Sequence, residues 1–176
     1  MAVFFHVRDL EIRAGRFDVE LPPGAVEFFD PKLRQAGPLK AAGKVELVLG
    51  SLGEIRVKGH MAVRMEVDCD RCLEPAQLPI NSDFELYYSP VSGGFGEEKA
   101  IDESEAEMGF YEGDGLELND VLRENVLLAL PMQRVCSPEC KGICPVCGQN
   151  RNQMNCQCQN AAGDDRWAAL KELKRV

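Results

Sequence analysis

Residues 55–67 read Ile-Arg-Val-Lys-Gly-His-Met-Ala-Val-Arg-Met-Glu-Val, and this stretch decides the fold. Its odd-numbered side chains are apolar except at Gly59, and most of its even-numbered side chains are charged or polar. A hydrophobic period of two is typical of a strand that buries one face and exposes the other. The stretch therefore predicts one long, half-buried strand.

The same alternation occurs on both sides of this strand. Residues 44–49 alternate before it, and the turn at 50–53 contains two glycines, so the two strands should pair as a hairpin. Residues 78–88 predict a third strand, and residues 17–21 predict an additional edge strand. Short connections between neighbouring strands favour an antiparallel meander over a parallel sheet with crossover helices.

Beyond residue 92 the composition changes. Residues 97–120 carry ten acidic side chains and one basic side chain, and their net charge of −9 equals that of the whole chain. Six glycines are interspersed between residues 93 and 115. This composition is typical of a solvated, flexible linker, and a docking strip for a basic partner is the alternative.

Two helices are predicted in the remaining sequence. Residues 118–131 are mostly apolar until a proline ends the run, so they should form a helix that packs on the sheet. A second, short helix should begin at Asp164, because Trp167, Leu170 and Leu173 would then share one face.

Together these elements predict an α+β protein in four parts. An antiparallel β-meander or partly closed sheet occupies residues 1–92, and an acidic, glycine-rich linker occupies residues 93–117. The packing helix follows at residues 118–131. Residues 132–176 are then expected to form a small cysteine-rich module, similar to a zinc ribbon, that ends in the second helix.

The eight cysteines are the most informative residues for chemistry. All of them lie after residue 68, two in mid-chain and six in the last quarter. No apolar run approaches the roughly 20 residues of a membrane helix, and the first residues lack the features of a signal peptide, so we expect a cytoplasmic protein. In a reducing cytoplasm, clustered thiols are more typical of a metal site than of disulfides.

The cysteine spacing predicts one or two zinc ions, the first bound in the tail and the second joining the tail to the sheet. Cys144-Pro-Val-Cys147-Gly148 has the form of a zinc knuckle, in which two thiolates turn toward one ion. The simplest partition gives each site four thiols: Cys144, Cys147, Cys156 and Cys158 in the tail, and Cys69, Cys72, Cys136 and Cys140 in the second site. Other pairings remain possible, because spacing does not determine which cysteines meet at one ion, and some thiols could bind no ion.

Other chemistries fit the sequence less well. The spacing of Cys140, Cys144 and Cys147 matches that of radical S-adenosylmethionine enzymes, but only 29 residues follow Cys147, too few for their barrel. Neither Cys-x-x-Cys pair opens a helix within a βαβ unit, as a thioredoxin-like redox pair would. The only histidines are His6 and His60, and no nucleophile or phosphate-binding motif occurs. We therefore expect no enzyme activity and no small-molecule substrate, with a redox or iron–sulfur protein as the weaker alternative.

Six short motifs follow one another along the chain from mid-sequence onward. They are Val67-Asp-Cys-Asp-Arg-Cys-Leu73, Leu128-Ala-Leu-Pro131, Cys140-Lys-Gly-Ile-Cys-Pro-Val-Cys-Gly148, Asn150-Arg-Asn152, Cys156-Gln-Cys158 and Asp165-Arg-Trp-Ala-Ala-Leu170. In this order they resemble the YceD family, the large ribosomal RNA subunit accumulation proteins. The resemblance implies a non-enzymatic factor that supports accumulation of 23S ribosomal RNA through ribosome assembly. Since family members differ in how many of these cysteines they keep, zinc would serve to stabilise a tail with little apolar content.

If the chain contacts ribosomal RNA or a large-subunit precursor, the polar residues near the cysteines are the candidates. Basic side chains would contact phosphates, and amides would form hydrogen bonds with bases or backbone. The candidates are Arg71, Arg134, Lys141 and Arg151 for phosphates, and Asn150 and Asn152 for hydrogen bonds. The alternative is a module that docks a ribosomal protein, with the acidic linker receiving a basic tail.

Overall fold

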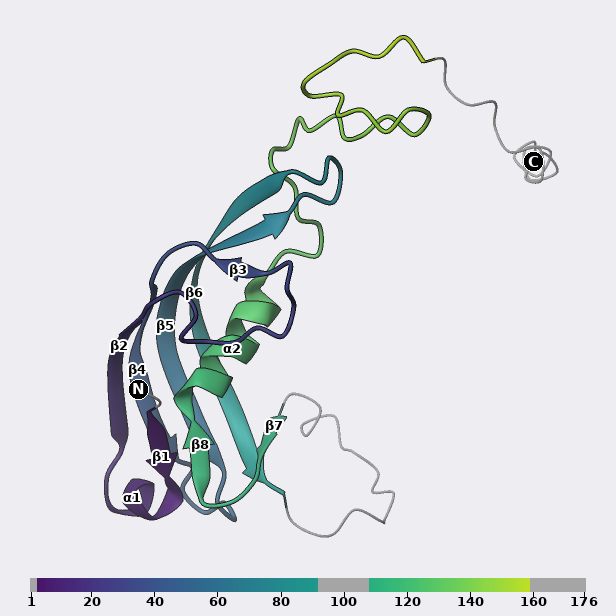
Figure 1. The fold of residues 1–176 in the computed structure, drawn as a ribbon. Coiled ribbons are helices and arrows are strands. Elements are labelled where there is room, and N and C mark those ends of the chain that lie inside the picture. The colour runs from purple at the N-terminus through teal and green to yellow at the C-terminus, as the bar shows by residue number, and fades with distance from the viewer. Residues whose placement is uncertain (1–2, 92–107, 159–176) are drawn as a thin grey trace, which may run out of the picture.

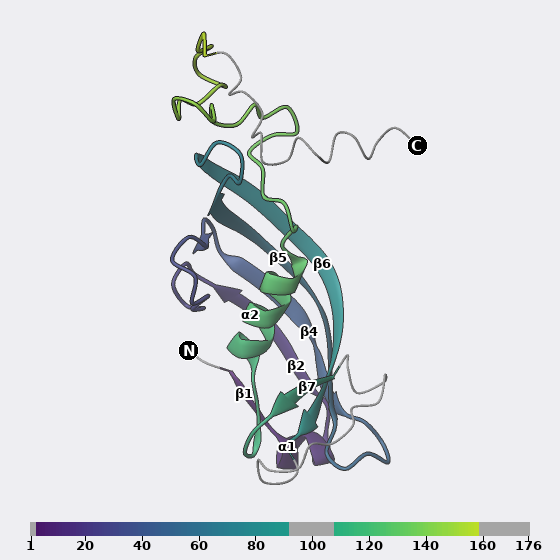
Figure 2. The ribbon, with the colours of Figure 1, turned by 90° about the vertical axis from the view of Figure 1, so that its right-hand side faces the viewer.

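The computed structural model describes residues 3–91 and 108–158 of the chain. A mostly antiparallel sheet curves around helix α2 (Leu118–Ala129), which packs against its inner face (Figure 1, Figure 2). The cysteine-containing chain that follows α2 extends beyond one end of the sheet (Figure 1). This architecture confirms the predicted α+β class and the predicted packing helix.

The large sheet has the strand order β2-β4-β5-β6-β7, and the short β3 pairs with a separate part of β5. Its strands are β2 (Gly15–Leu21), β3 (Arg34–Gln35), β4 (Leu39–Leu47), β5 (Ile55–Asp68), β6 (Pro75–Pro90) and β7 (Met108–Tyr111). All neighbouring strands are antiparallel except β6 and β7. A small second sheet pairs β1 (Phe4–His6) with β8 (Gly115–Glu117), and the short helix α1 (Val7–Ile12) follows β1.

The alternating stretch that predicted the long strand forms β5. Its odd-numbered side chains are buried except at the half-buried Gly59, and its even-numbered ones are partly or fully exposed. The predicted hairpin is formed by β4 and β5, in which Val45 lies opposite Val57. The third predicted strand is β6, and the predicted edge strand is β2.

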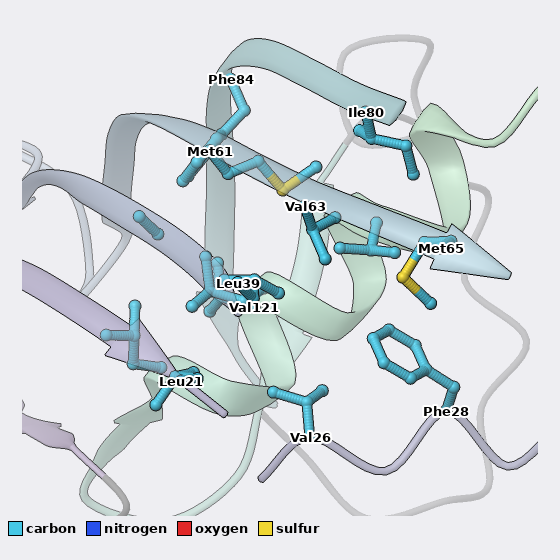
Figure 3. Close-up of a cluster of buried hydrophobic side chains, with 14 of the residues drawn as sticks. Leu21, Val26, Phe28, Leu39, Met61, Val63, Met65, Ile80, Phe84 and Val121 are labelled. Atoms are coloured by element: carbon cyan, nitrogen blue, oxygen red, sulfur yellow. The ribbon is translucent and has the colours of Figure 1, made fainter. Parts of the chain in front are cut away.

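The inner face of the sheet, the loop after β2 and helix α2 share one hydrophobic core (Figure 3). Leu39 of β4 and Met61 of β5 are fully buried, and Val26 and Phe28 contribute from the loop. Val121 is buried and lies on the face of α2 that packs into this cluster. Full burial of such a side chain contributes about 1.5–3 kcal/mol, so this contact holds α2 on the sheet.

A pair of glycines allows two aromatic rings to lie across the middle of the sheet. Gly43 of β4 is opposite Gly59 of β5, and the register places Phe17 of β2 and Phe84 of β6 on either side. A Cβ on Gly43 would lie 2.4 Å from the carbonyl oxygen of Lys58 and 2.6 Å from Cζ of Phe17. Strand glycines are typical of sites where a backbone or a ring approaches closely, and here they admit the Phe17 ring.

The structure corrects the second half of the predicted linker. Residues 92–107 lie outside the described residues, but residues 108–117 contain strands β7 and β8 instead of linker. Tyr111 and Leu116 are buried, and the Tyr111 hydroxyl donates a 2.6 Å hydrogen bond to the carbonyl of Gly53. A few well-placed apolar side chains hold these short strands, although glycines and acidic residues dominate the composition around them.

The direction of β7 also differs from the predicted meander, because β7 runs parallel to β6. Parallel neighbours need a crossover connection of about a dozen residues or more. The chain between the two strands, residues 91–107, is seventeen residues long and meets that requirement.

Part of the predicted cysteine-rich module cannot be compared with the structure. The helix expected from Asp164, with Trp167, Leu170 and Leu173 on one face, lies outside the described residues. In the two ranges that are described, neither helix has the length and apolar character needed to cross a membrane.

Candidate metal centres

Four thiols meet where the turn after β5 approaches the chain that follows α2. Cys69 and Cys72 lie between β5 and β6, whereas Cys136 and Cys140 come after α2. The four sulfur atoms all lie within 4.8 Å of one another. Because this group, named here the sheet group, pairs thiols that are 64 and 71 residues apart in sequence, it connects the sheet to the tail.

The other four thiols form a second group, named here the tail group. Cys144 and Cys147 lie in one turn, Cys156 and Cys158 follow, and the four sulfur atoms again lie within 4.8 Å of one another. The turn is closed by the Gly148 amide, which donates a 2.8 Å hydrogen bond to the Cys144 carbonyl. Gly148 has a φ of 73°, which residues with a Cβ rarely adopt. The structure thus groups the eight thiols in the same two sets as the simplest partition.

The sulfur–sulfur distances in the sheet group suit a tetrahedral metal ion. Sγ of Cys69 lies 3.9 Å from Sγ of Cys140, and Sγ of Cys72 lies 3.7 Å from Sγ of Cys136. Metal–sulfur bonds of about 2.3 Å at tetrahedral angles place the sulfurs about 3.8 Å apart. Disulfide sulfurs would be about 2.05 Å apart, and all eight cysteines are free. The donor set therefore fits a thiophilic ion in number, softness and spacing.

The sheet group combines thiols whose pKa values shift in opposite directions. Burial raises the pKa of Cys69, but the backbone amides of Cys72 and Cys136 outweigh it and lower that pKa to about 6. Contacts with the Cys140 and Cys72 side chains raise the pKa of Cys136 to about 12. Four thiolates this close repel one another, so all four can be ionised together only around a cation.

The tail group has the same electrostatic pattern in a more exposed setting. The amides of Cys147 and Val146 lower the pKa of Cys144 to about 6. Contact with Cys147 raises the pKa of Cys158 to about 12. Three of the four cysteines in the sheet group are buried, whereas Cys144 is the buried member of the tail group. The sheet group is therefore the better protected of the two sites.

Two of the residues predicted to contact RNA also form hydrogen bonds that hold the sheet group in place. The Asn152 side-chain amide donates a 3.3 Å hydrogen bond to Sγ of Cys140, and Oδ1 of Asn152 accepts a 2.8 Å hydrogen bond from the Lys141 backbone amide. The Arg71 guanidinium donates to the carbonyls of Pro138 and Cys140, each at 3.2 Å. These contacts fix the loop that carries Cys140 against the turn that carries Cys69.

Arg151 has a similar relation to the tail group, because its guanidinium lies 3.8 Å from Sγ of Cys144. A divalent ion with four thiolates has a net charge of −2, and an adjacent guanidinium offsets part of that charge. Lys141 differs from Arg151 in that it is exposed. Of the basic candidates near the thiols, Lys141 is therefore the one whose replacement disturbs the two thiol groups least.

Two acidic residues beside Cys69 and Cys72 belong to the site but were not predicted. Asp70 accepts a 2.7 Å hydrogen bond from the Arg134 backbone amide. Glu74 accepts hydrogen bonds from the side chains of Asn150 at 3.4 Å and Gln153 at 3.3 Å. Their position in the sequence could have identified them as part of the site, since each lies within two residues of Cys69 or Cys72.

Replacing Asn152 with alanine should weaken metal binding without unfolding the sheet. The variant removes the hydrogen bond to Cys140, and loss of such an outer contact typically lowers metal affinity by about 10–100-fold. Competition against a chromophoric chelator measures the change. Asn155→Ala, at an exposed asparagine in the same tail, is the matched control. Equal affinities for the two variants would contradict the role of Asn152.

A comparison with protein families matches residues 57–174 to the family described as Large ribosomal RNA subunit accumulation protein YceD. The match covers most of the chain and includes all eight cysteines. The chain belongs to the YceD family. This confirms the resemblance that the ordered motifs predicted.

Curated relatives of this YceD-family chain are found in bacteria and in a plant. Uncharacterized proteins of Mycobacterium tuberculosis and Mycobacterium bovis are each 31% identical over 133 residues, which cover 73% of this chain and 60% of the relative. The Large ribosomal RNA subunit accumulation protein YCED homolog 1, chloroplastic, of Zea mays is 27% identical over 131 residues, 61% of this chain and 45% of the maize protein. The matched region thus spans about 60% of the mycobacterial relatives. No solved structure matches the chain.

Proposed function

We propose that this YceD-family protein is a non-enzymatic, cytoplasmic factor that supports accumulation of 23S ribosomal RNA by assisting large-subunit assembly. The observation that carries the proposal is the family match, which covers both thiol groups. The family description names accumulation of the large ribosomal RNA subunit, and the maize relative has the same description. In this proposal the protein acts through its surfaces and not through bond-making groups.

Zinc is the ion we propose for both thiol groups, in a structural role. Sets of four thiolates are typical of closed zinc sites, which leave no position for a substrate. Between residues 131 and 158, the buried residues are Cys140, Gly142 and Cys144. The described part of the module thus has no hydrophobic core of its own, and bound zinc would supply the folding free energy that a core provides elsewhere.

The weaker alternative, an iron–sulfur or redox protein, predicts a different visible absorption spectrum and a different bound metal. Protein purified without oxygen should be colourless and contain zinc if the sites are structural zinc sites. Visible absorption that disappears on exposure to air, together with bound iron, would support a cluster instead.

The proposed function is tested in cells that lack this protein, by measuring 23S relative to 16S ribosomal RNA. We expect 23S RNA to fall and the unmodified gene to restore it. His60 lies on the exposed face of the sheet and pairs with Asp83 at 2.8 Å, so His60→Ala should restore 23S RNA as well. A normal 23S level in the deletion strain would contradict the proposal, and failure of His60→Ala would point to catalysis.

Lys141→Gln should weaken binding of the purified protein to large-subunit RNA. Each phosphate contact contributes about one unit to the slope of log affinity against log salt, so this variant should lower that slope by about 1. Lys32→Gln, at an exposed lysine in the loop between β2 and β3, is the control. Equal salt slopes for both variants would remove Lys141 from the RNA contact.

Docking of a ribosomal protein remains the second candidate function. A pull-down from cell extract after ribonuclease digestion distinguishes docking of a ribosomal protein from binding of RNA. A complex that survives digestion indicates protein contacts, and a complex that is lost indicates RNA contacts.

A further inference from the structure

We propose that a groove between α2 and the strands β6, β7 and β8 binds a basic, amphipathic segment of a partner protein. The groove has a volume of about 710 Å³. It is formed by elements other than the thiol groups, and the inference does not depend on the proposed role in ribosomal RNA accumulation. Two properties of its lining carry the inference: exposed apolar side chains, called here the floor, and carboxylates, called here the rim.

The floor consists of large apolar side chains that the fold leaves uncovered. Phe110 of β7 is 63% exposed and Leu128 of α2 is 69% exposed, and both line the groove. Leu127 and Phe4 line it as well, with exposed fractions of 41% and 45%. The opposite face of α2 is already buried in the core, so this second apolar surface has no role in holding the helix on the sheet. Clustered apolar exposure of this kind is typical of an interaction site.

The rim of the groove is acidic. Four carboxylates and one guanidinium line it, which gives a net charge of −3. The carboxylates belong to Glu112, Glu117, Asp120 and Glu124. The guanidinium belongs to Arg123, which pairs with Asp120 at 2.8 Å and lies over the Phe29 ring at 4.8 Å. Because Arg123 is engaged within the protein, the charge offered to a partner is negative.

One of these carboxylates is held in a fixed position. The Tyr88 hydroxyl donates a 2.7 Å hydrogen bond to Oε2 of Glu124. Burial and this carboxylate raise the pKa of Tyr88 well above its usual value, so Tyr88 remains a hydrogen-bond donor at neutral pH. The groove therefore presents at least one pre-oriented acceptor beside its apolar floor.

These features together favour a basic amphipathic peptide over a nucleic acid. A helix with apolar residues on one face and lysines or arginines beside them would cover the floor and neutralise the rim. Nucleic-acid phosphates would instead meet carboxylates of the same charge sign.

The test uses the full chain and a fluorescent amphipathic peptide of leucine and lysine, about 14 residues or four helical turns long. Fluorescence anisotropy should show saturable binding that weakens as salt rises. The double variant Phe110→Ala/Leu128→Ala should bind the peptide at least about tenfold more weakly, since both anchors are lost. The matched control is Leu49→Ala/Leu52→Ala, at two leucines that are 99% and 96% exposed at the β4–β5 turn. This control should bind as the unmodified chain does.

A second pair of variants tests the rim without touching the floor. Glu112→Gln/Glu117→Gln should weaken binding at low salt and reduce its salt dependence. Glu11→Gln/Asp18→Asn removes the same charge at exposed residues outside the groove. This control should change neither the affinity at low salt nor its salt dependence. Thermal unfolding of each variant checks that the fold is retained.

Three results would overturn the proposal. The first is equal weakening by the groove variants and their controls. The second is equally tight binding of a peptide in which glutamate replaces every lysine, or binding of a single-stranded RNA that Phe110→Ala/Leu128→Ala weakens. The third is the absence of saturable binding below about 1 mM, which corresponds to about −4 kcal/mol.

Discussion

Serine at both Cys69 and Cys72 should lower bound zinc from about two ions per chain to about one and release the tail from the sheet. The sheet group takes half of its thiols from this turn, and two cysteines cannot retain a tetrahedral ion. Structural zinc supplies on the order of 10 kcal/mol of binding free energy to small modules at neutral pH. Metal analysis with thiol counting measures the ion, and limited proteolysis between α2 and Cys144 measures the release.

The matched variant is Cys156→Ser/Cys158→Ser, which also removes two thiols and one ion. It leaves the sheet group complete, so proteolysis should begin only beyond Cys144. Two outcomes would contradict our assignment of the sheet group. One is that the Cys69/Cys72 variant still holds two ions, and the other is that both variants show the same cleavage pattern.

Gly43→Val should lower the free energy of unfolding by about 3 kcal/mol or more, the upper end of the usual cost of overpacking. Its Cβ would lie 2.4 Å from the Lys58 carbonyl oxygen and 2.7 Å from Cα of Gly59, and both contacts are to backbone. A side chain could rotate away, but the neighbouring strand can move only by breaking its pairing. For a protein of this size the melting temperature should fall by roughly 10 °C, which thermal and urea unfolding will measure.

Gly37→Ala is the control for this experiment. No atom lies within 4 Å of the Cβ it would add, and Gly37 is not among the glycines with positive φ. It should therefore change stability by less than about 0.5 kcal/mol. If Gly43→Val were as mild as this control, the close approach of β4 and β5 at Gly43 and Gly59 would be wrong.

The sequence predicted the strands whose hydrophobic alternation is long enough to be recognised. β5 and β6 extend over 14 and 16 residues, and their periodicity of two is unambiguous. β1 and β8 have three residues each and β3 has two, so no period can develop within them. These short strands depend on their partners: Arg34 of β3, for example, lies opposite Glu66 of β5 and forms an ion pair with it at 3.1 Å.

The grouping of the thiols could also be predicted, because four-coordinate sites and eight cysteines leave a simple partition. The hydrogen bonds that support the thiol groups could not be predicted from the sequence. Asn152 reaches a thiol 12 residues away and Arg71 reaches a carbonyl 69 residues away, through loops whose paths only the structure shows. The sequence alone therefore predicts RNA contacts for the basic and amide side chains beside the cysteines, and the structure adds that Asn152 and Arg71 support the sheet group.

If each thiol group binds an ion, as proposed, the connection between sheet and tail also determines when the protein can take up its ions during synthesis. Cys140 is translated 71 residues after Cys69, an interval of about 4–14 s at about 5–20 residues per second. Until Cys136 is made, the nascent chain exposes an open two-thiol half-site, which has to avoid capture by another soft ion or by an oxidant. The tail group, by contrast, lies entirely within residues 144–158, so it can load as soon as Cys158 has emerged.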